Sequence, residues 1–333
     1  MADPINPPPA APVTVLVTGG AGYVGSHAAK ALAAAGHRPV VFDTLSRGHA
    51  RAVRWGPLVQ GDIRDGAALD ATLAEYRPAA VMHFAALALV GEGESDPATY
   101  WDVNVAGTLS LLNAITRAGL TSLVFSSTCA VYGRPDVAAI AESTPLNPLN
   151  TYGRTKLAAE CLMTSWHSLG LRHAALRYFN AAGADPTGLI GEAHTPETHL
   201  IPLTLDAAAG GAPLAVFGSD YDTPDGTAIR DYVHVDDLAT AHVRALDHLL
   251  AGGDSLTLNL GSGTGHSVRQ VIHAVEQVTG RPVPITAAPR RAGDPPRLVA
   301  AAEHAQRILG WTATGSSLTR IVETAWAWHN RRP

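Results

Sequence analysis

The sequence has few cysteines, no long apolar run and no signal for export. Its 333 residues include only two cysteines, Cys129 and Cys161, which are too few for a disulfide framework, so a reducing cytoplasm is the expected location. No apolar run reaches the roughly 18 residues of a membrane span. The proline-rich residues 1–12 lack the apolar core and basic flank of a signal peptide and are expected to form a disordered tail. We therefore expect no membrane partner.

Positive charge is also scarce. The formal net charge is -5 and no long basic run occurs, which gives no electrostatic basis for a nucleic-acid partner. A hydrophobic content of 46% and a charged content of 16% are typical of a globular chain of enzyme size. Among the 15 histidines, His194 and His199 have the spacing closest to a metal site, but no cysteine or further carboxylate fits a known pattern. No metal is predicted.

Short apolar runs alternate with helical stretches along the first part of the chain. A β-rich run at 13–17 is followed by glycines and by a helical stretch at 24–35. This alternation predicts an α/β fold with a doubly wound parallel sheet. Beyond Asn180 the pattern weakens into loops, which indicates a smaller C-terminal α/β lobe. Further strands are expected at 40–42, 80–84, 122–126, 174–177, 230–235 and 256–260, and further helices at 201–209, 268–278 and 318–329.

The glycines after the first strand are typical of a dinucleotide site. Gly20, Gly22 and Gly25 fit the G-x-G-x-x-G pattern, and Gly19, Gly22 and Gly25 fit a related three-residue spacing. Either spacing lets the backbone approach a pyrophosphate at the N-terminus of the helix, where the first N–H groups and the helix dipole stabilise its charge. The sequence therefore predicts a Rossmann-like cofactor site.

An acidic residue indicates which dinucleotide is bound. Asp43 follows the second strand, eighteen positions beyond Gly25, where a carboxylate can accept hydrogen bonds from the adenosine ribose. This favours NAD as the cofactor. Arg47 lies close enough in the sequence to accept a 2'-phosphate, so NADP stays open at this point.

A tyrosine and a lysine four residues apart suggest proton transfer beside that cofactor. Tyr152 and Lys156 project from one face of a predicted helix, so the ammonium can lie near the phenol and favour its ionised form. A phenolate base needs such help because an unperturbed tyrosine titrates near pKa ~10. Thr128 follows a strand, at the edge of a parallel sheet where ligands bind.

With these motifs, the chain resembles the extended short-chain dehydrogenase/reductase family, Rossmann-fold enzymes that use a hydroxyl, a tyrosine and a lysine. Within that family it is most similar to the enzymes that epimerise UDP-hexoses at C4. The resemblance runs from Val13 to about Asn330. Besides the glycine turn, the motifs that carry it are Gly61-Asp62-Ile63-Arg64, His83-Phe84-Ala85-Ala86, Asn104 to Thr108, Leu176 to Asn180, Asp225 to Val235 and Pro289 to Asp294.

The resemblance implies reversible C4 epimerisation of UDP-glucose and UDP-galactose through a transient 4-keto sugar and enzyme-bound NADH. Tyr152 would be the base, Lys156 its electrostatic partner and Thr128 the partner of the substrate hydroxyl. A homodimer is also implied. The implied cofactor residues are Gly19, Gly22, Tyr23, Val24, Gly25, Asp43, Asp62, Ile63, Phe84, Ala85, Ala86, Asn104, Tyr152, Lys156, Tyr178 and Phe179; the implied substrate residues are Thr128, Asn180, His199, Leu200, Val216, Phe217, Arg230, Arg291 and Asp294.

The two arginines of the substrate set, Arg230 and Arg291, would hold the diphosphate, since a guanidinium donates two hydrogen bonds to phosphate oxygens. The expected domains follow from the same resemblance. Residues 13–180 and 234–262 would form the NAD-binding domain, and residues 181–233 and 263–333 the UDP-sugar-binding lobe.

Several positions depart from the family pattern. Thr128 stands where many members have serine, Ala88 where some have a lysine that reaches the cofactor, and His199 where some have an asparagine that contacts the substrate. Leu298 occupies a position that helps to decide whether an N-acetylated sugar fits, and its intermediate size leaves that question open.

Three alternative functions are weighed against this one. Another NDP-sugar 4-epimerase, acting on an N-acetylhexosamine, a pentose or a uronate, stays open because the loops of the hexose pocket cannot be placed. A dehydratase is disfavoured, since Thr128 is followed by Cys129 and Ala130 and not by the Asp-Glu pair that supplies its proton transfer. A non-catalytic NAD-binding sensor would not need Tyr152 and Lys156.

Overall fold

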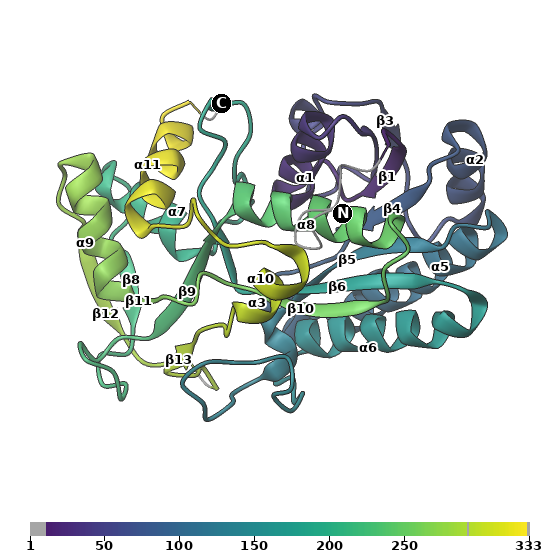
Figure 1. Ribbon diagram of the computed structural model, residues 1–333. Helices are drawn as coiled ribbons and strands as arrows, with labels where there is room; N and C mark the ends of the chain where they lie inside the picture. Colours follow the sequence, from purple (N-terminus) through teal and green to yellow (C-terminus); the bar gives the residue numbers. More distant parts are fainter. Residues whose placement is uncertain (1–10, 292, 332–333) are drawn as a thin grey trace.

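A computed structural model describes residues 11–291 and 293–331 (Figure 1). Residues 1–10 of the predicted disordered tail lie outside this range. A seven-stranded sheet in the order β3-β2-β1-β4-β5-β6-β10 organises the larger part of the chain, and all of its neighbouring strands run parallel. Its strands are β1 (Thr14–Thr18), β2 (Arg38–Asp43), β3 (Leu58–Gln60), β4 (Ala80–His83), β5 (Ser122–Thr128), β6 (Arg172–Tyr178) and β10 (Leu256–Leu260).

Helices cover both faces of this sheet because its strands are apolar on both sides. Val15 and Val17 face a core that includes α1 and α8, whereas Leu16 faces a second core that includes α2, α5 and α6. Figure 1 shows α8 above β6 and β10, with α6 below them. This arrangement confirms the predicted doubly wound fold. The helices are α1 (Tyr23–Ala34), α2 (Gly66–Tyr76), α5 (Gly107–Arg117), α6 (Thr151–Trp166) and α8 (Val235–Leu250).

Shorter elements lie between the main strands and helices, and most of them fall between β4 and α6. The chain leaves β4 through a loop and enters two short helices and a π-helical turn before α5. A 3-10 turn follows β5 directly. These elements are η1 (Ala50–Ala52), α3 (Val90–Ser95), α4 (Pro97–Trp101), η2 (Asp102–Ala106), η3 (Cys129–Tyr132) and η4 (His167–Leu169).

A smaller lobe is built around β9 (Ile229–His234), which pairs with β7, β11 and β13. Three helices, α7, α9 and α11, enclose a separate apolar core there. The lobe elements are β7 (Asn180–Ala182), α7 (Leu200–Ala208), β8 (Leu214–Phe217), β11 (Gly265–Ser267), α9 (Val268–Thr279), β12 (Ile285–Ala288), β13 (Arg297–Leu298) and α11 (Leu318–His329).

One C-terminal helix lies with the large sheet and not with this lobe. The helix α10 (Glu303–Leu309) places Ala305 and Leu309 in the core that contains α8 and β10, and Trp311 follows them. The predicted lobe range 263–333 therefore includes a segment that packs in the core beside the large sheet. The predicted domain boundaries stay predictions.

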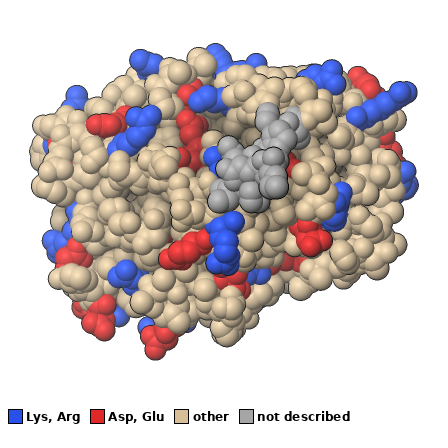
Figure 2. Space-filling model, in the orientation of Figure 1, with Lys and Arg blue, Asp and Glu red and all other residues tan. Residues whose placement is uncertain are grey.

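Charges of both signs are interspersed on the face of the molecule that Figure 2 shows. In the described part of the chain, no helix has both the length and the apolar character required to cross a membrane.

Candidate active site

The glycine turn lies where the sheet order reverses, between β1 and β4, the usual ligand position in such sheets. Gly19 has a φ of +72°, and a Cβ there would lie 2.4 Å from the backbone nitrogen of Ala85. A Cβ on Gly25 would lie 2.3 Å from the carbonyl oxygen of Gly19. The N-cap of α1, Gly22, offers no side chain to the first amides of the helix. The turn therefore has the open backbone that a pyrophosphate requires.

Asp43 lies against this turn. Its Oδ2 accepts a hydrogen bond from the amide of Ala21 at 3.0 Å, and its Oδ1 accepts one from Leu45 at 2.8 Å. Arg47 is engaged elsewhere, because its guanidinium pairs with Glu92 and donates to the carbonyl of Thr195. A carboxylate at the ribose position, with the nearby arginine turned to other partners, fits NAD better than NADP.

Two other residues of the predicted cofactor set are held by protein contacts. The amide of Asn104 donates to the carbonyl of Leu87 at 2.9 Å and to the hydroxyl of Thr155 at 3.0 Å, and it accepts from the amide of Leu87. It thereby ties the loop after β4 to α6. The Asp62 carboxylate accepts hydrogen bonds from Arg64, which lower the pKa of Asp62. Their contacts with a cofactor stay predictions.

The first turn of α6 carries the predicted catalytic pair. Asn150 begins this helix by accepting a hydrogen bond from the amide of Gly153 at 2.8 Å. A Cβ on Gly153 would lie 2.7 Å from the carbonyl oxygen of Ala130, so glycine allows α6 to approach the turn after β5 closely. This approach places Tyr152 beside Thr128, close enough for the Thr128 hydroxyl to influence the pKa of Tyr152.

Burial controls the electrostatics of this pair. It raises the pKa of Tyr152 far above the usual range, the nearby Tyr178 adds to that rise, and the Thr128 hydrogen bond opposes it. Burial also lowers the pKa of Lys156 to about 7, against the attraction of Glu160. Because desolvation disfavours the phenolate, the ionisation of Tyr152 through Lys156 stays a prediction.

Two contacts near the predicted catalytic residues have no counterpart in the sequence analysis. The Nζ of Lys156 lies 4.5 Å from the centroid of the Phe125 ring, a cation–π contact that the sequence did not indicate. Ser126 and Tyr178 also were not assigned together, yet their hydroxyl oxygens lie 2.6 Å apart. Burial raises the pKa of Tyr178 to about 12, and the Ser126 hydrogen bond opposes that rise.

On the side of the lobe, the predicted substrate residues form two contacts. Arg230 Nη2 lies 2.5 Å from Asp294 Oδ1, and Tyr221 donates to the same carboxylate at 3.3 Å. The guanidinium of Arg291 lies 4.1 Å from the ring centroid of Phe217. The two predicted arginines therefore come from β9 and from the segment before β13. Residue 292 of that segment lies outside the described part of the chain.

The other predicted residues occupy neighbouring elements. Asn180 begins β7, Val216 is buried in β8, and Phe179 is buried beside Leu298. His199 is the N-cap of α7 and Leu200 its first residue. Of the predicted cofactor residues, Ile63 is buried, and Phe84, Ala85 and Ala86 are partly buried. Ala88, one of the departures from the family pattern, is exposed.

The fold and this site are those of a Rossmann-fold enzyme that uses a dinucleotide cofactor. The model of the NAD dependent epimerase/dehydratase family matches residues 15–261, and the chain belongs to that family. It is 54% identical over 318 residues to the UDP-glucose 4-epimerase of Rhizobium leguminosarum bv. trifolii, covering 95% of this chain and 97% of that one. This likeness confirms the resemblance inferred from the motifs.

Solved structures agree with this result. The UDP-glucose 4-epimerase of Brucella ovis in complex with NAD is 52% identical, with a TM-score of 0.92 over 94% of this chain and 97% of that chain. The UDP-glucose-4-epimerase of Stenotrophomonas maltophila, with bound NAD and formylated UDP-arabinopyranose, is 44% identical, with a TM-score of 0.93 over 96% of this chain and 98% of that chain.

Proposed function

We propose that this chain is an NAD-dependent epimerase that interconverts UDP-glucose and UDP-galactose at C4. The observation that carries the proposal is the placement of Thr128 at the end of β5 beside Tyr152 in the first turn of α6, with Lys156 one turn further along, at the same edge of the sheet as the glycine turn. The identity of 54% to a UDP-glucose 4-epimerase over nearly the whole chain supports it.

When bound, NAD supplies a hydride acceptor that returns the hydride to the sugar. Tyr152 takes the proton of the 4-hydroxyl and gives it back, and the hydroxyl of Thr128 orients the same sugar oxygen. Because burial holds Tyr152 in its neutral form, its ionisation needs a positive charge nearby, for which the site offers Lys156 and the oxidised nicotinamide.

The substrate must be held at its nucleotide end. Inversion at C4 requires that the hexose present both faces to one nicotinamide, so tight binding of the sugar ring would oppose turnover. Arg230 and Arg291 are assigned to the diphosphate, with Asp294 and Phe217 orienting their guanidinium groups. The substrate is therefore expected to bind mainly through UDP.

A product panel tests the proposal. The purified protein is incubated without added cofactor with UDP-glucose, UDP-galactose, their N-acetyl forms, UDP-xylose, UDP-arabinopyranose and UDP-glucuronate in separate reactions, and products are resolved by chromatography. Conversion of both hexoses to one equilibrium mixture is expected. Conversion of only a pentose, a uronate or an N-acetylhexosamine would assign another substrate, and loss of water would indicate a dehydratase. If no sugar were converted, the non-catalytic NAD-binding sensor would be the remaining alternative.

We infer two further properties of the protein. The family resemblance supports a homodimer, which analytical ultracentrifugation would detect as twice the mass of the 34.6 kDa chain. The two unpaired cysteines support a cytoplasmic location. Burial raises the pKa of the Cys129 thiol to about 12, so this thiol is a poor nucleophile and is not expected to take part in the chemistry.

A further inference from the structure

Two histidines and two glutamates converge before α7. One potential ligand atom of each residue, Glu192, His194, Glu197 and His199, lies within 4.8 Å of all the others. His199 Nδ1 lies 2.6 Å from Glu192 Oε1 and 2.8 Å from Glu197 Oε1. His194 Nδ1 lies 3.1 Å from Glu192 Oε1. We call these four residues the 192–199 cluster.

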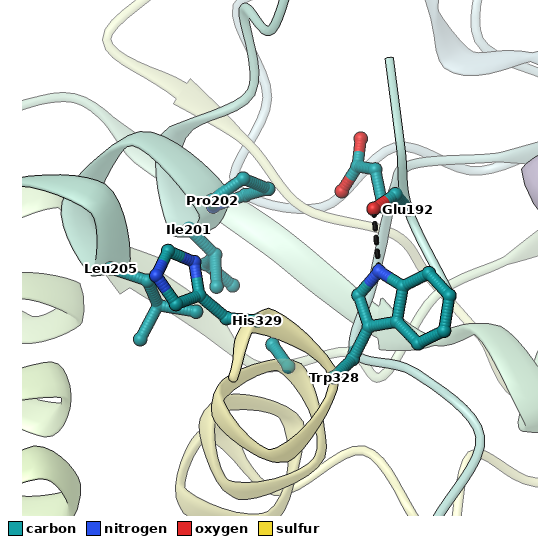
Figure 3. A pocket seen from close by; sticks show the side chains of 8 residues that line it. Glu192, Ile201, Pro202, Leu205, Trp328 and His329 are labelled. Carbon is teal, nitrogen blue, oxygen red and sulfur yellow. Dashed lines mark hydrogen bonds between the residues drawn. The ribbon is translucent and has the colours of Figure 1, made fainter. Parts of the chain in front are cut away.

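Protein contacts hold the two glutamates of the cluster in place. Glu192 is 7% exposed, and the indole of Trp328 on α11 donates to its backbone carbonyl at 2.7 Å (Figure 3). Figure 3 also shows the Glu192 carboxylate pointing away from that indole. Glu197 Oε1 accepts hydrogen bonds from the amides of Thr198 and His199 at 2.7 and 2.8 Å. Contacts outside the cluster therefore orient the backbone of Glu192 and the carboxylate of Glu197. The Glu192 carboxylate itself contacts His194 and His199.

The histidine rings are also oriented. The ring of His194 meets that of Tyr23 edge-on, with centroids 6.4 Å apart, and lies 5.1 Å from the ring of His199. Each imidazole directs its Nδ1 toward the carboxylate oxygens. The cluster thus presents two nitrogen and two oxygen donors toward one position.

We propose that the 192–199 cluster binds one divalent transition-metal ion of the zinc type. Zinc is commonly held by four nitrogen, sulfur or oxygen ligands at about 2.0–2.1 Å for imidazole, which places tetrahedral ligands about 3.3 Å apart. The three nitrogen–oxygen separations of 2.6 to 3.1 Å would widen by about 0.2 to 0.7 Å through side-chain rotation. Two imidazoles disfavour Mg²⁺ and Ca²⁺, which prefer oxygen ligands alone.

The position of the cluster gives such an ion a structural effect. His49, in the segment after β2, contacts the carbonyl of Ala193 at 2.9 Å, and Arg47 donates to the carbonyl of Thr195 at 3.2 Å. Tyr23, in the first turn of α1, donates to the carbonyl of Gly183. An ion bound by the cluster would cross-link a segment that already covers the cofactor domain, so the folded state should become more stable to heat.

The test measures metal binding directly and does not depend on turnover. Full-length protein without a histidine tag is treated with a chelator and dialysed against Zn²⁺, and bound zinc is measured by atomic absorption. Co²⁺ is used as a second probe, because a tetrahedral site gives it a strong visible absorption. The variants are His194→Gln, which removes a partly exposed ligand, and His273→Asn, which changes an exposed histidine on α9.

One zinc ion per chain is expected for the wild type and for His273→Asn, with a rise in melting temperature on adding Zn²⁺. His194→Gln should bind zinc at least about tenfold more weakly and lose the cobalt absorption, while its circular dichroism and NAD content stay normal. Absence of stoichiometric zinc would show that the contacts are only those of a histidine salt bridge. Equal binding by His194→Gln and the wild type would also overturn the proposal.

Discussion

Arg177 on β6 and Glu160 on α6 form a buried ion pair behind the predicted catalytic helix. Arg177 Nη2 lies 2.6 Å from Glu160 Oε2, and Arg177 Nε lies 3.0 Å from Glu160 Oε1. Both side chains are less than 10% exposed. Glu160 also accepts a hydrogen bond from Ser127, and Arg177 donates to the hydroxyl of Tyr132 at 3.0 Å. Because Glu160 lies one turn beyond Lys156, this pair links the sheet to the electrostatics of the site.

Replacement of Glu160 by glutamine should destabilise the protein and alter the titration of Lys156. The variant leaves the guanidinium of Arg177 buried without its counter-charge, a change that typically reduces the free energy of unfolding by about 3 kcal/mol or more. It also removes the negative charge that raises the pKa of Lys156, so that pKa should fall below its value of about 7. Urea unfolding and NMR titration of the lysine measure the two effects.

The sign of the pH effect follows from the depressed pKa of Lys156. Between pH 7 and ~10.4, the usual value for the unfolded chain, the unfolded state of the cofactor-free protein binds one proton more, so stability rises with pH through that window. In Glu160→Gln the rise should begin at lower pH. Asp70→Asn, which breaks the exposed pair with Arg117, is the matched control and should change stability by less than about 1 kcal/mol. Similar losses in both variants would contradict this account.

The sequence predicted the elements that carry the site better than the contacts between them. The strand at 256–260 and the helix at 318–329 have the predicted bounds, because apolar residues recur in them with a clear period that indicates a buried face. The short strands β11 and β13, with three and two residues, have no period to detect. Tyr152 and Lys156 were found because one helix carries both.

Contacts across elements have no local signal. The pair of Glu160 and Arg177 joins a helix to a strand, and the motif at 176–180 that contains Arg177 does not indicate its partner. The spacing of His194 and His199 fits no known metal pattern in the sequence, yet the loop folds back and brings both histidines beside Glu192 and Glu197. Contacts of this kind depend on how distant segments pack together, which the local sequence does not show.

Tyr152→Phe should abolish nearly all turnover and leave the fold intact. The change removes only the hydroxyl that contacts Thr128, so melting temperature and NAD content should stay close to those of the wild type. Loss of a general base lowers kcat by about 10²- to 10⁴-fold. Chromatographic rates measure this. The control is Tyr76→Phe at the end of α2, outside the site, which should retain full activity. Near-normal activity of Tyr152→Phe would exclude Tyr152 as the base.

Acid should destabilise the fold through buried histidines. Burial lowers the pKa of His83 to about 3 and those of His234 and His242 to about 4. Between these values and the unfolded value of ~6.5, the unfolded state binds more protons, so stability falls as pH decreases through the window. Each histidine contributes a slope of about 1.4 kcal/mol per pH unit. Urea unfolding at intervals from pH 7 to 4.5 measures the total slope.

His242→Leu isolates one of these contributions. In the described part of the chain Nε2 of His242 has no hydrogen-bond partner, and Nδ1 contacts only the carbonyl of Leu238 in its own helix at 2.8 Å. An apolar side chain should therefore be tolerated, and the acid slope should decrease by one proton. His167→Asn, at an exposed position after α6, should leave the slope unchanged. An unaltered slope in His242→Leu would refute the assignment.

Gly25→Ala tests whether the glycine turn holds the cofactor by close backbone approach. The added Cβ would lie 2.3 Å from the carbonyl oxygen of Gly19, so the turn must open and the amides at the start of α1 must move. The purified variant should have lost most of its NAD, measured by chromatography after denaturation, and should melt at a lower temperature.

A matched glycine on α3 separates this effect from the general cost of a methyl group. At Gly91 a Cβ meets nothing within 4 Å, and the residue is helical, so Gly91→Ala should keep its NAD and gain up to about 1 kcal/mol in the free energy of unfolding. Added NAD should restore the melting temperature of Gly25→Ala only at concentrations far above those that saturate Gly91→Ala. If both variants retained NAD equally, the pyrophosphate would have to bind somewhere other than the turn between β1 and α1.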